Sequence, residues 1–144
     1  MAWGFGRVGY GAYRVGLMLA TPHARDTLHQ TVRVLHQSGA LPAYDALGRA
    51  KLRMLGPAFG TKFLFFAQAS GARPRALIHD EAVSTWLARH TSVGVATTAW
   101  IAPKYERYLA ILHDWAGQLG IEPEAVELCV FRSMAAERGN QWSK

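Results

Sequence analysis

Two residues of this chain have types and positions that could support covalent chemistry. Lys62 follows a turn over residues 56–61 that contains proline and glycine, and it precedes the apolar run of residues 63–67. Asp80 comes further along, where another helical pattern begins. A lysine amine that burial keeps unprotonated is a nucleophile. A carboxylate beside it can stabilise a developing cation. The pair therefore indicates nucleophilic catalysis, provided that the fold brings the two groups together.

Proline, glycine and the spacing of apolar residues divide the chain into elements that would position this pair. Helices are predicted over about residues 22–37, 42–55, 61–70, 81–89, 103–119 and 123–136. No stretch alternates apolar and polar residues for long enough to form a sheet. We therefore expect an all-α fold, a compact helical bundle.

The length of 144 residues fits one domain, which we place over residues 1–144. Its expected parts are an irregular lead-in over residues 1–11, a helix–hairpin–helix motif over 42–70 and a polar tail over 137–144. On this prediction, Lys62 lies in the first turn of its helix, where the helix dipole disfavours an ammonium group. Asp80 is expected to cap the next helix and to stay ionised.

The composition favours a folded, nucleic-acid-binding protein. Apolar residues make up 50% and charged residues 18% of the chain, which excludes an intrinsically disordered sequence. The net charge of +6 favours a polyanion partner such as nucleic acid, double-stranded DNA included, and the alternative is a soluble protein that is simply basic. Cys129 is the only cysteine, which excludes an intramolecular disulfide, and its apolar surroundings predict a packed core thiol.

The sequence also gives expectations for the localisation of the protein and for its use of metals and cofactors. The N-terminus lacks the layout of a secretory signal, and no apolar run approaches the roughly 20 residues that span a bilayer. We expect a cytoplasmic, nucleoid-associated protein with no membrane contact, no metal and no cofactor. The sequence leaves the oligomeric state open.

The turn before Lys62 has features of an anion site. Gly60 would let the backbone approach a ligand closely, and the first amides of a helix have no partner within that helix. Such a site binds phosphate without reading sequence. The expected DNA-binding residues are those of the turn and of the basic face leading to it. They are Gly56, Ala58, Gly60, Thr61, Arg49, Lys51 and Arg53.

The pattern around this turn resembles the helix–hairpin–helix DNA glycosylases, and among them the 8-oxoguanine DNA glycosylase branch. The family hairpin reads approximately Pro-Gly-Val-Gly-Thr-Lys, and residues 57–62 here read Pro-Ala-Phe-Gly-Thr-Lys. An aspartate some twenty residues on opens the next helix in that family, as Asp80 does here. The resemblance covers about residues 42–90. Ala58 replaces the first hairpin glycine, and the family's usual N-terminal portion has no counterpart.

The resemblance implies a base-excision DNA glycosylase with AP lyase activity on an oxidised purine such as 8-oxoguanine. Lys62 would attack the sugar and form a Schiff base, and Asp80 would stabilise the sugar cation. His79, Trp100 and Tyr105 are the candidates for the base pocket. One alternative is a non-catalytic helix–hairpin–helix module that binds DNA without a complete base pocket. A third reading is a bundle that binds another protein.

Overall fold

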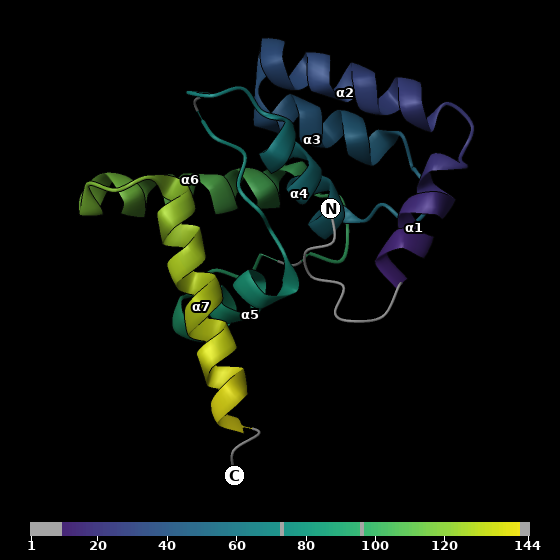
Figure 1. The fold of residues 1–144 in the computed structure, drawn as a ribbon. Coiled ribbons are helices and arrows are strands. Elements are labelled where there is room, and N and C mark those ends of the chain that lie inside the picture. Colours follow the sequence, from purple (N-terminus) through teal and green to yellow (C-terminus); the bar gives the residue numbers. More distant parts are fainter. Residues whose placement is uncertain (1–9, 73, 96, 142–144) are drawn as a thin grey trace.

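The computed structural model describes residues 10–72, 74–95 and 97–141 (Figure 1). Across these ranges the chain forms seven helices and no strand. The helices are α1 (Tyr10–Leu19), α2 (Ala24–Ser38), α3 (Ala40–Arg49), α4 (Pro57–Ala67), α5 (Glu81–His90), α6 (Ala102–Leu119) and α7 (Pro123–Gln141). The all-α prediction is confirmed. None of the described helices is both long enough and apolar enough to span a membrane.

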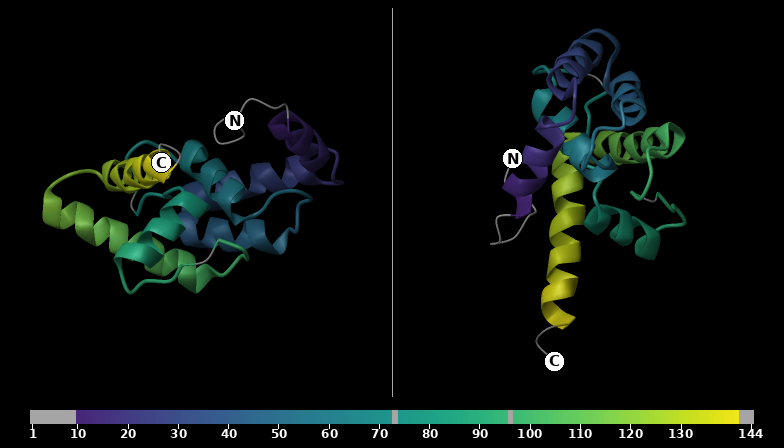
Figure 2. Two further views of the ribbon diagram at one scale, coloured as in Figure 1. Left: turned by 90° about the horizontal axis from the view of Figure 1, so that it is seen from below. Right: turned by 90° about the vertical axis from the view of Figure 1, so that its right-hand side faces the viewer.

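The helices surround one main core. Helices α2 and α3 lie side by side at one end of the molecule, and α5 packs along α7, which extends to the C-terminus (Figures 1 and 2). The buried residues of the core come from α2 to α7, including Tyr44 of α3, Leu64 of α4, Leu87 of α5 and Leu112 of α6. A smaller cluster of Met18, Ala24 and Leu52 attaches α1.

The helices on either side of the predicted hairpin begin and end earlier than expected. Helix α3 ends at Arg49 instead of near residue 55, because Lys51 and Met54 have φ of 49° and 64°, outside the right-handed helical region. Helix α4 begins at Pro57 instead of residue 61, with the proline in its first turn. Lys62 therefore lies in the second turn of α4, where the helix dipole acts more weakly on its amine.

Three further differences concern single elements. Helix α1 has no counterpart in the prediction, and it begins within the expected lead-in, of which residues 1–9 lie outside the described part of the chain. Helix α7 continues to Gln141, into the expected polar tail. Cys129 is exposed, so the prediction of a core thiol is wrong. Its neighbours Val126 and Val130 take the core-facing positions of α7.

Candidate active site

A buried connecting segment delivers Asp80 to the middle of the molecule. Residues 76–79 lie between α4 and α5 without regular secondary structure, and all four are buried. A buried backbone must have its polar groups satisfied, and here no neighbouring strand is available among the described residues. Side chains from the surrounding helices take the place of a strand.

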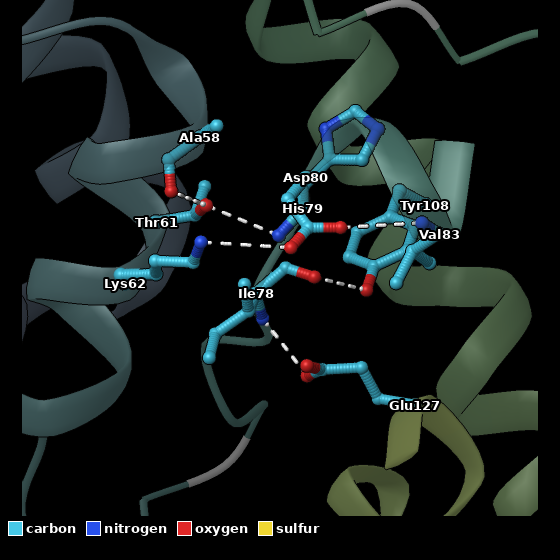
Figure 3. Close-up of polar contacts among 9 residues, drawn as sticks. All are labelled: Ala58, Thr61, Lys62, Ile78, His79, Asp80, Val83, Tyr108 and Glu127. Carbon is cyan, nitrogen blue, oxygen red and sulfur yellow. Dashed lines mark hydrogen bonds and ion pairs between the residues drawn. The ribbon is translucent and has the colours of Figure 1, made fainter. Parts of the chain in front are cut away.

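These side chains come from α4, α6, α7 and the residue that follows α4. Gln68 binds both backbone groups of Ala76 at 2.8 and 3.1 Å, and Tyr105 Oη binds both backbone groups of Leu77 at 3.2 and 2.9 Å. The remaining bonds run from Ile78 N–H to Glu127 Oε2 (2.9 Å), from Tyr108 Oη–H to the Ile78 carbonyl (2.7 Å) and from His79 N–H to Thr61 Oγ1 (3.0 Å) (Figure 3). The segment is thus fixed on several sides, which fixes the position of Asp80.

Asp80 uses its two carboxylate oxygens for different contacts. Oδ1 accepts a hydrogen bond from Val83 N–H at 3.2 Å and caps α5. Oδ2 lies 3.5 Å from Lys62 Nζ (Figure 3). The structure therefore brings together the two residues that the sequence singled out, and it also gives Asp80 its expected capping role.

The Lys62–Asp80 pair is largely shielded from water. The side chains are 9% and 14% exposed, so the attraction between them is screened less than at a surface. Lys62 Nζ also lies 5.4 Å from the centre of the Phe59 ring, one turn earlier in α4. An amine and a carboxylate held this way can act on one substrate atom only if a substrate enters beside them.

A recess lies one helical turn further along α4 from Lys62, and neither Lys62 nor Asp80 is among its lining residues. It has a volume of about 560 Å³, within the roughly 300–1,000 Å³ usual for small-molecule sites. It lies between α4 and α7 and is almost wholly apolar. Its lining is Phe65, Phe66, Ile78, Glu124, Ala125, Glu127, Leu128 and Phe131. Phe65 and Phe66 follow Lys62 by three and four residues, so they share a face of α4 with it.

Glu127 is the buried acidic group of this recess. The residue is 7% exposed, and burial raises the pKa of its carboxyl to about 8, although the bond from Ile78 N–H and the charge of Lys62 oppose the shift. The sequence interpretation missed Glu127 because it lies in an apolar helical run. A lone carboxylate on a helix face that otherwise packs into the core is the signal that could have found it.

Two of the three residues predicted to line a base pocket are fully buried instead. His79 Nε2 donates to the Val95 carbonyl at 3.1 Å, its ring stacks on Tyr108, and burial lowers its pKa to about 4. Tyr105 packs against Tyr44 with 4.4 Å between ring centroids. His79 is 1% exposed and Tyr105 is fully buried. His79 belongs to the segment that leads to Asp80, and Tyr105 binds that segment at Leu77.

Trp100, the third pocket candidate, is half-buried and wedges between α3 and α4. A Cβ atom on Gly48 would lie 2.8 Å from Trp100 Cβ, and one on Gly60 would lie 2.1 Å from Trp100 Cη2. Both glycines therefore make room for one indole ring. Gly60 permits a close approach to its backbone, as expected, but the group that approaches is the side chain of Trp100. The backbone N–H of Gly60 donates to the Gly56 carbonyl at 2.9 Å.

The predicted DNA-binding residues separate into buried and accessible groups. Gly60 and Thr61 are buried and present no surface to a phosphate, whereas Gly56 and Ala58 are half-buried at the start of α4. Three basic residues on and before the connection to α4 are exposed: Arg49, Lys51 and Arg53. Arg49 pairs with Asp45 at 2.5 Å, one turn earlier in α3.

Residues 1–131 match the sequence model of a family described as "Putative 8-oxoguanine DNA glycosylase OGG-like protein". The chain belongs to this OGG-like family. No curated protein and no solved structure matches the chain.

Membership in the OGG-like family supports a DNA glycosylase-like role in DNA repair and, with it, DNA as the partner. The match begins at residue 1 and therefore includes α1, α2 and α3. The family match thus covers the predicted hairpin, Asp80 and most of the rest of the chain. The OGG-like match also includes Glu127 and Phe131 of α7, which line the recess.

Proposed function

We propose that this OGG-like chain is a DNA glycosylase with AP lyase activity that removes an oxidised purine such as 8-oxoguanine. Residues 1–144 would form a single glycosylase domain. The observation that carries the proposal is the shielded pair of Lys62 Nζ and Asp80 Oδ2, 3.5 Å apart. An apolar recess one helical turn along α4 from Lys62 supports it. If Lys62 were an ordinary surface lysine and Asp80 only a helix cap, neither a shielded contact between them nor a nearby recess would be needed.

Lys62 would act as the nucleophile. Its Nζ must release a proton to expose a lone pair, which then attacks C1′ of the target sugar. The bond from C1′ to the base breaks, and the base leaves with the bonding electrons and takes up a proton. After the amine has lost a proton, the nitrogen lone pair forms the C1′=N bond of a Schiff base as the C1′–O4′ bond breaks, and O4′ takes up a proton. Removal of a C2′ proton then expels the 3′ phosphate by β-elimination and cuts the strand.

Asp80 would stabilise the positive charge that develops on the sugar as the base departs. Its carboxylate already lies beside Lys62, held by Val83 N–H on one oxygen and by a segment with many hydrogen bonds. A charge fixed before the reaction begins costs little reorganisation during it. This preorganisation supports an electrostatic role for Asp80 in addition to its role as a helix cap.

The recess would receive the target base after it rotates out of the duplex. A base inside a duplex is unreachable, so glycosylases extrude it into a pocket at a cost of a few kcal/mol. Phe65, Phe66 and Phe131 offer aromatic faces on which a purine can stack. The exposed Lys51 and Arg53, with the start of α4, would hold the flanking phosphates.

Borohydride trapping tests the proposal, because reduction of a Schiff base links the enzyme covalently to DNA. We expect the wild-type chain to be trapped on a duplex that contains 8-oxoguanine and the Lys62→Gln variant to give none. Lys104→Gln is the matched control, since it removes a half-buried lysine of α6 that has no part in the proposed site. Equal trapping by Lys62→Gln and wild type would remove Lys62 as nucleophile. Salt-dependent binding without any trapping would favour a non-catalytic DNA-binding module.

A further inference from the structure

The recess between α4 and α7 combines exposed aromatic surface with one buried acid. Phe66 is 63% exposed and Leu128 is 39% exposed, although both are large apolar side chains. Phe65 and Phe66 meet edge to face with 5.2 Å between ring centroids. Exposed apolar surface of this kind marks a binding site for an apolar or aromatic group. Glu127 is the group that could make such a site selective among aromatic ligands.

The carboxyl of Glu127 is held in one orientation. Its Oε2 accepts the Ile78 N–H at 2.9 Å, and Ile78 is two residues from Asp80 (Figure 3). A carboxyl whose Oε2 acts as this acceptor carries its proton on Oε1. In the neutral form that second oxygen is a hydrogen-bond donor, and in the ionised form it is an acceptor.

The groups around Glu127 decide which form is present. Four acidic groups interact electrostatically with Glu127: Asp80, Glu124 of α7, and Tyr105 and Tyr108 of α6. Lys62 is the cation that acts on it from α4. Arg75 is bound to Glu124 at 3.1 Å. Because burial outweighs the attraction of Lys62, the pKa of Glu127 rises to about 8 and its carboxyl is neutral at pH 7.

We propose that Glu127 is a specificity-determining residue that, as a neutral carboxylic acid, donates a hydrogen bond to an acceptor atom of the base seated in the recess. The inference rests on the proposed glycosylase function and names the substrate class more narrowly. The base must be an aromatic ring with a carbonyl oxygen or unprotonated ring nitrogen directed at α7. The carbonyl edge of an oxidised guanine meets that requirement. Ionised Glu127 would repel the same atom.

The test compares wild type with Glu127→Gln at several pH values. Glutamine keeps an acceptor for Ile78 N–H and offers an amide donor that does not titrate. Base excision from an 8-oxoguanine duplex is measured under single-turnover conditions. The ratio of the wild-type rate to the Glu127→Gln rate is expected to fall about tenfold between pH 7 and pH 9, as a group with a pKa near 8 loses its proton. Taking the ratio cancels the effects of pH that act equally on both proteins.

Two controls separate this inference from the proposed function. Glu122→Gln removes an exposed carboxylate just before α7, and its profile should follow that of wild type. Borohydride trapping on a preformed abasic site needs no base in the recess, so it reports on Lys62 alone. Failure of wild type both to be trapped there and to excise base from the 8-oxoguanine duplex would overturn the glycosylase function itself.

Given trapping, two results would overturn the role of Glu127. A ratio that stays constant with pH would mean that Glu127 is only structural. A ratio that rises with pH would mean that ionised Glu127 accepts a hydrogen bond from the base instead of donating one.

Discussion

At the scale of single residues, Asp80 is the clearest case of one side chain with two roles. Oδ1 caps α5 through Val83 N–H, and Oδ2 faces Lys62 Nζ. The two roles can be separated by substitution because asparagine caps a helix about as well as aspartate does but carries no charge.

The Asp80→Asn variant should therefore keep the fold and lose catalysis. We expect the variant to fold with a lowered melting temperature, because Lys62 loses its shielded anionic partner. Excision of 8-oxoguanine should slow by about 10²-fold or more, the usual effect of removing one preorganised electrostatic group. Single-turnover excision and thermal denaturation measure the two quantities. Asp45→Asn, which removes an exposed carboxylate of α3, is the control for charge alone. Wild-type excision by Asp80→Asn would show that the carboxylate only caps α5.

Residue types in the sequence indicated Lys62 and Asp80 because both stand out against their neighbours. The same reasoning placed His79 and Tyr105 in a base pocket, because an aromatic ring can stack on a nucleobase as well as it can pack in a protein core. Burial in the folded protein decides between a pocket and a core position. The hydrogen bonds between Tyr105 Oη and Leu77 depend on a contact between segments that are distant in the sequence. No local pattern could predict them. Glu127 was hidden for the same reason.

At the scale of elements, the approach of α3 to α4 depends on Trp100. The indole occupies the space that side chains at Gly48 and Gly60 would fill. Glycine inside a helix normally costs about 0.5–1 kcal/mol relative to alanine. Here the cost is offset by a close packing of two helices around one ring, and α4 is the helix that carries Lys62.

Alanine substitutions at two helical glycines should accordingly have opposite effects. Gly60→Ala would drive a Cβ against Trp100, and overpacking of this kind typically costs about 1–3 kcal/mol. Gly117→Ala in α6 has open space and should stabilise the protein by about 0.5–1 kcal/mol. Urea denaturation measures both free energies of unfolding. A Gly60→Ala protein as stable as Gly117→Ala would mean that Trp100 does not hold α4 in place.

Element boundaries were less predictable than element types. The Gly56–Pro57 pair was interpreted as the end of one helix, yet proline is equally suited to the first turn of the next, and the structure uses it there. The earlier end of α3 depends on positive φ at Lys51 and Met54, residues that give no such signal in sequence. The start of α5 at Asp80 was easier to predict, because a capping side chain followed by Glu81 marks the beginning of a helix locally.

At the scale of the whole molecule, two buried ionisable groups make stability depend on pH in opposite directions. His79 has its pKa lowered to about 4 in the folded state, below its usual value, so its contribution is present above that usual value and is lost as the pH falls towards 4. Glu127 has its pKa raised to about 8, so its contribution is complete below the usual pKa of a glutamate and is lost as the pH rises towards 8.

Between about pH 6.5, the usual pKa of a histidine, and pH 8, Glu127 is therefore the one of these two groups whose contribution still changes. Over this interval the unfolded chain has already released the Glu127 proton, whereas the folded chain still holds it. The free energy of unfolding should fall by about 2 kcal/mol across these 1.5 pH units on account of Glu127, at 1.36 kcal/mol per unit. Urea denaturation at matched ionic strength measures the slope.

The Glu127→Gln variant should lack this part of the slope, because its amide keeps an acceptor for Ile78 N–H and does not titrate. The difference between wild type and variant isolates Glu127 from every other group that titrates in the same range. The Glu122→Gln variant, which loses an exposed carboxylate, should run parallel to wild type. If the wild-type and Glu127→Gln curves are also parallel, the folded protein holds Glu127 ionised at neutral pH. The recess would then present an acceptor to a base in place of a donor.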